Sequence, residues 1–417
     1  MKTIKDARVG WNTIVALGLI PLSGFAMDVF IPSLPDMAAQ LHTTPAAIQL
    51  TLSLFIISFG VSQLLVGGLI DSFGRYWPSL ISLAIFSIAS FSIAYTNNLQ
   101  LIYGLRVIQG ITVATIVVSK RAFFVDRYSG DQLKKYTSLF SVIWSIAPIV
   151  APFLGGFFQT QWGWSSNFMF LGYFGLFFLL IELWIGGESI KARQPFSVRN
   201  FIGSYTHMLK ASDFGAALII LGLTYAMLLV YGMGSPFLIE QRMQYSPVVT
   251  GYCALFSGVS VFIGGSLSRM LIQRPFMKKL LIASSVQLLA TALLIPLTMH
   301  YQNIFTLLLY VFLLHSMGGF IFNNLMSYNL TRFPQYAGKA SGLTGGGFAI
   351  VTSIISSLLA SLLSITNQAV LGVSYGILAL GVFLLLVKTK WKHDRAKPSG
   401  DAPEAAPVTI KVKLASA

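Results

Sequence analysis

Long apolar segments recur along the whole chain, with only short polar connections between them. An α-helix needs about 20 apolar residues to cross a bilayer. Because a lipid-embedded segment must satisfy its backbone polar groups internally, each such segment is predicted to be a helix. The sequence therefore predicts an all-α integral membrane protein with twelve transmembrane helices, near 11–31, 47–70, 78–96, 99–122, 134–158, 165–186, 213–237, 248–272, 279–298, 302–329, 339–363 and 367–388.

Composition excludes several other classes of protein. Apolar residues fill 55% of the 417 positions and charged residues only 10%, which is incompatible with a soluble, charged surface. The net charge of +15 arises from lysines and arginines in short runs between apolar segments, so we expect membrane lipids and not nucleic acid as their neighbours. No phosphate-binding loop, metal-ligand cluster or nucleophilic triad pattern is present, and we expect neither a cofactor, nor a metal, nor enzymatic activity.

The placement of the cations predicts the orientation in the membrane. If the N-terminus is cytoplasmic, every lysine and arginine except Arg106 and Arg242 falls in a cytoplasmic segment. The positive-inside rule then places both termini in the cytoplasm, which requires an even number of spans. One missed or invented span would invert every later loop.

A polar stretch near residues 187–212, the longest inside the chain, divides the spans into six and six. We expect an N-terminal six-helix bundle over 1–188, a cytoplasmic linker over 189–212 and a C-terminal six-helix bundle over 213–388. The chain turns polar near its end, and a disordered cytoplasmic tail is expected over 389–417.

One permanently charged side chain, Arg106, lies inside the apolar run 99–122. A cation at mid-membrane costs roughly 2.5–3.5 kcal/mol on the mildest insertion scales, so it should face a wet cavity or a carboxylate. Asp28 is the only acidic residue of the first run. At 1.5 Å per residue the two side chains should differ in depth by less than ~10 Å. The alternatives are that backbone carbonyls bind Arg106 and that water surrounds Asp28 at a helix end.

A shared cavity would give this pair a function. Burial favours the protonated form of Asp28, whereas a nearby Arg106 favours the carboxylate. A conformational change that alters this balance would couple proton movement to substrate movement.

In the second half of the chain, His315 lies near the middle of the span 302–329. Histidine can change charge near neutral pH, although a neutral, hydrogen-bonded core histidine is the more common case. Further polar residues occur in the same span and in the span 213–237, and some are expected to line a cavity: Asn323, Asn324, Ser327, Tyr328, Tyr225, Tyr231 and Ser235.

Three motifs resemble those of the major facilitator superfamily, whose members have two six-helix bundles. Residues 67–75 (GGLIDSFGR) are similar to the signature G-x-L-x-D-R-x-G-R, with Ser72 in place of an arginine. Residues 105–110 (LRVIQG) resemble L-x-x-R-x-x-Q-G and match it at Arg106, Gln109 and Gly110. Residues 147–156 (APIVAPFLGG) resemble the antiporter signature that ends in G-P-x-x-G-G, with Ala151 in place of a glycine.

Within the superfamily, the chain is most similar to the bacterial Bcr/CflA drug:proton antiporters. The similarity lies in residues 27–35 (MDVFIPSLP), in residues 147–156 and in residues 337–342 (AGKASG). It implies a monomeric secondary transporter of the bacterial inner membrane that exports small amphipathic or cationic compounds by alternating access, driven by protons. The same scaffold also permits a dedicated carrier of a metabolite such as a siderophore or an amino acid, including an importer.

The resemblance also implies roles for particular residues. Gly67, Asp71, Gly74 and Arg75 would brace the cytoplasmic gate, with Asp71 near the start of the eleventh span. Pro148, Pro152, Gly155 and Gly156 would let the fifth span bend and pack closely, either as a structural kink or as an antiporter-specific gate. The candidates for proton coupling and substrate binding are Asp28, Arg106, Gln109, Tyr231, His315, Asn323 and Asn324.

Overall fold

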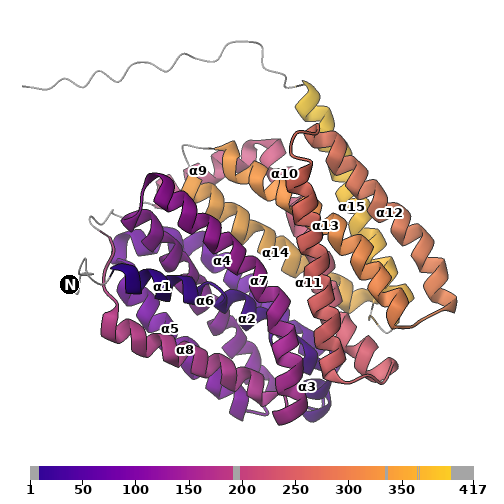
Figure 1. The fold of residues 1–417 in the computed structure, drawn as a ribbon, viewed down its shortest axis with the longest axis horizontal. Coiled ribbons are helices and arrows are strands. Elements are labelled where there is room, and N and C mark those ends of the chain that lie inside the picture. Colours follow the sequence, from indigo (N-terminus) through magenta and orange to yellow (C-terminus); the bar gives the residue numbers. More distant parts are fainter. Residues whose placement is uncertain (1–8, 191–197, 334–336, 364, 366, 396–417) are drawn as a thin grey trace, which may run out of the picture.

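The computed structural model describes residues 9–190, 198–333, 337–363, 365 and 367–395, and long helices dominate these residues (Figure 1). Most of the predicted tail lies outside the described residues, from 396 onward. The last helix continues past the predicted boundary at 388 and ends at Arg395.

Prolines divide the first predicted span into short helices. Pro21 directly precedes the second of these, and Pro32 is the second residue of a single 3-10 turn, because proline supplies no N–H to continue a helix. The pieces are α1 (Val9–Leu19), α2 (Leu22–Asp28), η2 (Ile31–Ser33) and α3 (Leu34–Gln40). The remaining helices of the N-terminal half are α4 (Pro45–Phe73), α5 (Tyr76–Tyr95), α6 (Leu99–Arg127), α7 (Gly130–Trp162) and α8 (Ser165–Ile185).

The second half repeats this pattern of long helices. Its first helix, α10 (Ser212–Pro236), continues into the π-helical turn η3 (Phe237–Arg242). The others are α11 (Pro247–Met270), α12 (Phe276–His300), α13 (Ile304–Arg332), α14 (Ala337–Leu363) and α15 (Gln368–Arg395). A further helix, α9 (Val198–Lys210), lies in the segment that we predicted as a linker.

Eleven candidate spans meet the length and composition of a membrane crossing in the described residues. The predicted fifth span, 134–158, falls inside α7, which at 33 residues is also long enough to cross. The helices therefore agree with the twelve predicted spans, including the fifth, where α7 continues through Pro148 and Pro152.

The helices form two bundles, each with its own apolar core. The N-terminal half, indigo to magenta, and the C-terminal half, rose to yellow, lie on opposite sides of the molecule (Figure 1). Between the bundles, α4 packs along α14 and α7 packs along α11. We call the end that carries α9 and the turn at residues 74–75 the linker end, and the end that carries α3 and η3 the distal end.

Large apolar side chains are exposed on the outward surfaces of both bundles. Examples are Ile88 on α5, Leu180 on α8, Leu293 on α12 and Leu384 on α15, each more than half exposed. Such extensive apolar exposure would be unfavourable in water. Such a surface is expected where lipid, and not water, surrounds the protein.

Candidate functional site

Arg106 is completely buried in the N-terminal bundle, where it binds acceptors on three helices. Its Nη1 donates to the carbonyl oxygen of Ala26 on α2 (2.9 Å) and to Oε1 of Gln109 on α6 (2.7 Å). Its Nε donates to the carbonyl oxygen of Thr51 on α4 (3.3 Å). Gln109 in turn donates to Ser90 Oγ on α5 (2.8 Å). The guanidinium group therefore links helices α2, α4 and α6, and Gln109 extends this network to α5.

Two aromatic rings and a close helix contact complete the surroundings of Arg106. Its guanidinium carbon lies 4.5 Å from the ring centre of Phe30 and 4.4 Å from that of Phe55, the geometry of cation–π contacts. The next turn of α6 approaches α4 so closely that a Cβ at Gly110 would overlap Ser58 and the backbone of Phe55. A glycine at this position allows α6 to bring Arg106 against α4.

Asp28 is the last residue of α2 and is 7% exposed. Its Oδ2 atom is buried without a hydrogen-bond partner, and so is Nη2 of Arg106. The two side chains lie within electrostatic range of each other. They form no ion pair in the described part of the chain. The contacts of Arg106 thus match the alternative in which backbone carbonyls bind it, while Asp28 is buried and not surrounded by water.

Helix α7 packs against the chain directly after Asp28. A Cβ at Gly155 would overlap the carbonyl oxygen of Val29, so only glycine permits this approach. On its other side, α7 meets the C-terminal bundle, where a Cβ at Gly156 would crowd the carbonyl oxygen of Pro247 on α11. The signature glycines of the fifth span therefore lie where α7 contacts both bundles.

The same signature contains two prolines, Pro148 and Pro152, and the structure describes the surroundings of Pro152 only. The backbone of Pro152 lies against α11, where a Cβ at Gly251 would stand 3.0 Å from the carbonyl oxygen of Pro152. The side chain of Pro148 lies outside the described residues.

Three aromatic side chains of the C-terminal bundle form a cluster that we call the aromatic trio: Tyr225 on α10, Phe322 on α13 and Phe348 on α14. Their ring centres lie 5.3 to 5.8 Å apart. Tyr225 is partly exposed, and its helix α10 packs against η2, the turn that follows Asp28 in the chain. The trio thus joins α10, α13 and α14 within the C-terminal bundle. Sequence reasoning named Tyr225 but missed both phenylalanines, because a chain with 32 phenylalanines gives no signal for two of them.

His315 lies in the interior of the C-terminal bundle and is fully buried. Its Nδ1 is 2.7 Å from Ser257 Oγ on α11, and its Nε2 is 3.0 Å from the hydroxyl of Tyr375 on α15. The ring of Tyr231 packs edge-on against it at 5.3 Å. Because both ring nitrogens are hydrogen-bonded inside one bundle, this arrangement corresponds to the core-histidine alternative.

The two predicted asparagines join α13 to α11 and do not lie beside Asp28. Asn323 donates to the carbonyl oxygen of Gly265 (3.2 Å), and Asn324 donates to Ser268 Oγ (2.7 Å). A Cβ at Gly264 would overlap the carbonyl oxygen of Ser316, so the two helices touch here. Amide side chains at such a contact hydrogen-bond across it.

A charged cluster occupies the linker end of the N-terminal bundle. Asp71 and Arg75 form an ion pair (2.9 Å), and Nε of Arg75 lies 2.7 Å from Asp126 on α6. Gly74 has a φ of 96°, a conformation that favours glycine, whereas a Cβ at Gly67 would meet no atom within 4 Å, so no close backbone approach requires glycine there. The side chain of Asp71 is half exposed and pairs with Arg75 within its own helical turn, and among the described residues it forms no ion pair with the start of α14, near which the resemblance places it.

Glu188 and Asp126 belong to this cluster, although sequence reasoning did not select them. The buried Glu188 carboxylate accepts hydrogen bonds from the backbone N–H groups of Arg75 (3.0 and 3.1 Å) and Tyr76 (3.3 Å) at the start of α5. This is the favourable position for an anion on a helix dipole. The available signal was the presence of acidic residues at span ends in a chain with only 13 of them.

Helix α9 joins the two bundles at the linker end. The hydroxyl of Tyr205 donates to the carbonyl oxygen of Leu64 on α4 (3.1 Å), and Lys339 on α14 donates to Ser204 (2.7 Å). Burial raises the pKa of Tyr205 to about 12, so its hydroxyl keeps its proton at neutral pH. The segment predicted as a linker therefore includes a helix that contacts both halves of the chain.

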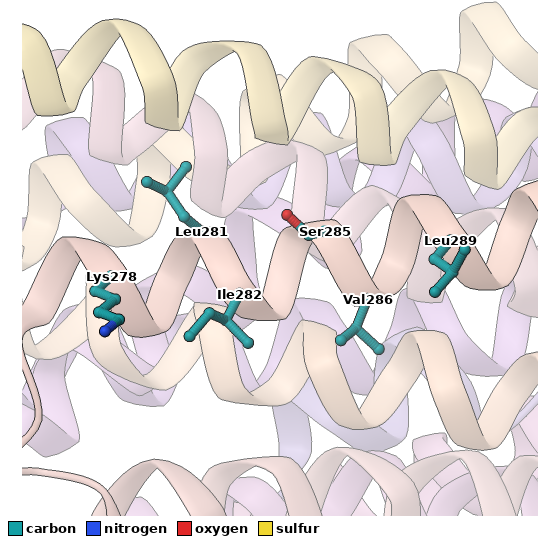
Figure 2. A pocket seen from close by; sticks show the side chains of 6 residues that line it. All are labelled: Lys278, Leu281, Ile282, Ser285, Val286 and Leu289. Atoms are coloured by element: carbon teal, nitrogen blue, oxygen red, sulfur yellow. The ribbon is translucent and has the colours of Figure 1, made fainter.

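A shallow groove runs along one face of α12 and is lined by residues of that helix alone, with Lys278 at one end and Leu289 at the other (Figure 2). Its lining is mostly aliphatic and includes none of the residues described above. We therefore do not treat this groove as the functional site.

Comparison with known proteins agrees with the fold and the motifs. The sequence model of the Major Facilitator Superfamily matches residues 17–356. Multidrug resistance protein D of Escherichia coli (strain K12) is 26% identical over 381 residues, covering 90% of this chain and 95% of that protein. A bicyclomycin resistance protein homolog of Haemophilus influenzae is 26% identical over 363 residues, covering 84% and 89%.

A solved structure extends the agreement to three dimensions. A crystal structure of the nucleoside transporter NupG superposes with a TM-score of 0.68 and covers 92% of this chain and 99% of its own, at 16% identity. At that identity the match shows the fold alone. The chain belongs to the major facilitator superfamily and is a multi-pass membrane transporter, not an enzyme, with relatives among the Bcr/CflA-like drug-resistance proteins.

Proposed function

We propose that this chain is a proton-coupled exporter of small amphipathic or cationic compounds. The observation that carries the proposal is the buried carboxyl group of Asp28, which has an oxygen without a hydrogen-bond partner. A buried carboxylate needs a neutralising partner. A proton and an organic cation can both serve, and binding of one disfavours the other. This competition is the elementary requirement of proton–substrate exchange.

The surroundings of the site support an amphipathic substrate. Aromatic faces attract cations and also bury apolar groups. The relatives named for multidrug and bicyclomycin resistance favour export of such compounds over a dedicated metabolite carrier. Arg106 and Gln109 would hold the helices around Asp28 in place and supply a fixed positive charge near it.

The transport cycle would follow from the two-bundle architecture. We propose that the bundles of residues 1–188 and 213–388 rock against each other along the α4–α14 and α7–α11 contacts, with 189–212 as their connection. The turn that contains Gly67, Asp71, Gly74 and Arg75 would close the linker end. The signature of Pro148, Pro152, Gly155 and Gly156 would govern closure on the distal side.

The cation distribution leads us to propose that the linker end is cytoplasmic, with the protein in the bacterial inner membrane and both termini inside. We further propose that the transporter acts as a monomer, because each chain contains its own Asp28 and its own aromatic trio.

Everted membrane vesicles test the proposed export directly. In vesicles energised by respiration, the full-length protein should concentrate a fluorescent lipophilic cation inside the vesicles. A protonophore should release that cation, and vesicles without the protein should not accumulate it. Accumulation that persists after the proton gradient collapses would contradict proton-coupled export.

A further inference from the structure

The seam at which α4 meets α14 brings the two bundles into close backbone contact. A Cβ at Gly346 on α14 would stand 2.5 Å from the carbonyl oxygen of Gly60 on α4. One turn nearer the linker end, a Cβ at Gly342 would stand 3.3 Å from the hydroxyl of Tyr205 and 3.6 Å from the carbonyl oxygen of Gln63. The Tyr205 hydroxyl, which belongs to α9, therefore lies at the seam itself.

Helix α9 is fastened to the C-terminal bundle. A single residue separates α9 from the start of α10. Met208 of α9 is fully buried, in one apolar cluster with Phe214 of α10 and Leu343 of α14. Lys339, in the first turn of α14, donates a hydrogen bond to Ser204 of α9 (2.7 Å). Because these contacts join α9 to two helices of the C-terminal bundle, we expect α9 to move with that bundle.

Tyr205 connects α9 to the N-terminal bundle. Its hydroxyl donates to the carbonyl oxygen of Leu64 on α4 (3.1 Å), and the Leu64 side chain packs against the same apolar cluster. A movement that separates the bundles at the linker end must carry Leu64 away from Tyr205. That movement therefore breaks the hydrogen bond.

We propose that α9 is a strap across the α4–α14 seam, and that the hydrogen bond from Tyr205 to Leu64 holds the linker end closed. The inference rests on the proposed rocking of the bundles. It goes beyond that proposal, because the connection between the bundles then restrains one of the two openings and does more than join the halves of the chain.

The distal half of α4 carries the opposite restraint. Ser353 on α14 donates to the carbonyl oxygen of Ser53 (2.8 Å), and Gln49 on α4 donates to the carbonyl oxygen of Met233 on α10 (2.9 Å). These side chains are buried between the two bundles. Hydrogen bonds near the two ends of one helix thus oppose opening at the two ends of the molecule, and loss of either set should favour the opening that it opposes.

The distance between two spin labels across the linker end tests this inference in the purified full-length protein. The labels are attached to Gln132→Cys near the start of α7 and to Gln273→Cys after α11, in a Cys253→Ala background, because both glutamines are exposed. Tyr205→Phe removes the donor and keeps the ring. We expect the ratio of long to short distances to rise about five-fold, which corresponds to the net contribution of one hydrogen bond.

Two further variants make the test specific. Tyr103→Phe is the matched control, because the Tyr103 hydroxyl donates to another carbonyl oxygen of α4, that of Ala47 (2.7 Å), but does so inside the N-terminal bundle. It should leave the ratio unchanged. Ser353→Ala removes a restraint on the distal half of the seam and should lower the ratio.

The outcomes separate the inference from the proposed function. An unchanged ratio in Tyr205→Phe, or an equal rise in Tyr103→Phe, would overturn the strap and leave proton-coupled export standing. If the distance is the same in every variant, at every pH and with or without a fluorescent lipophilic cation, the bundles do not rock. That result overturns the proposed transport cycle together with the inference.

Discussion

Inside the N-terminal bundle, three hydrogen-bond acceptors and two aromatic ring faces surround the Arg106 guanidinium group and take the place of the water that would hydrate a cation in solution. Planar guanidinium geometry is suited to this site, because several N–H groups point in fixed directions at once. The depth of Arg106 and Asp28 could be predicted by counting residues along helices. Which atoms they bind could not, because helix rotation is not determined when nearly all faces are apolar.

Substitutions at Arg106 should separate its geometry from its charge. Arg106→Lys keeps the charge but cannot reach the Ala26 and Thr51 carbonyls and Gln109 together, so we expect transport to be largely lost in a protein that still inserts. Arg106→Ala should also lower stability, because hydrogen bonds to charged groups contribute about 1.5–3 kcal/mol each. Thermal unfolding of both purified variants measures the loss of stability, and a transport assay measures the loss of activity. A fully active Arg106→Lys would contradict it.

At the scale of elements, the helices were predictable because spans of about 20 apolar residues have few alternatives to a helix in lipid. The break in the first span follows Pro21 and Pro32, which the sequence contains, yet its position beside Asp28 emerged only from the structure. The amides of Asn323 and Asn324 show what hydropathy cannot predict. The span that contains them was predicted correctly, but their hydrogen-bond partners on α11 depend on a tertiary contact that sequence spacing does not encode.

The contact of α7 with the chain after Asp28 can be tested with one methyl group. Gly155→Ala places a Cβ onto the Val29 carbonyl oxygen, and overpacking of this kind costs typically about 1–3 kcal/mol. Gly104→Ala is the control, because no atom lies within 4 Å of the position of its Cβ. We expect the melting temperature to fall in the first variant only. Equal melting temperatures would contradict the close contact.

At the scale of the whole molecule, the distribution of cations predicts a topology that the helix arrangement alone does not orient. The loops at residues 41–44 and 96–98 lie at the end opposite α9, and the turn at residues 271–275 lies at the linker end. The even number of spans and the two bundles follow from hydropathy. The helix in the linker, α9, was not predicted, because it is shorter and more polar than the spans around it.

Single cysteines in a Cys253→Ala background test this topology. In intact cells, a membrane-impermeant maleimide should label Thr43→Cys and Asn97→Cys. Arg274→Cys, an exposed position near the linker end, should react only after the membrane is permeabilised. Labelling of Arg274→Cys from outside, with protection of the other two, would invert the proposed orientation.

Coupling through Asp28 is the central claim, and the most direct measurement follows substrate and protons together. The protein is reconstituted in liposomes with an imposed pH gradient, and a fluorescent lipophilic cation and the internal pH are recorded at once. Asp28→Asn keeps size and hydrogen bonding but removes the titratable charge. Asp36→Asn is the control, since Asp36 lies at the distal end of the same span and accepts hydrogen bonds from Gln40 and Gln159.

Wild type and Asp36→Asn should accumulate the cation against its gradient with a matching change in internal pH. Asp28→Asn should let the cation only equilibrate, with no coupled proton movement. If Asp28→Asn still accumulates substrate at the wild-type proton stoichiometry, Asp28 is not the coupling carboxylate and the account is wrong.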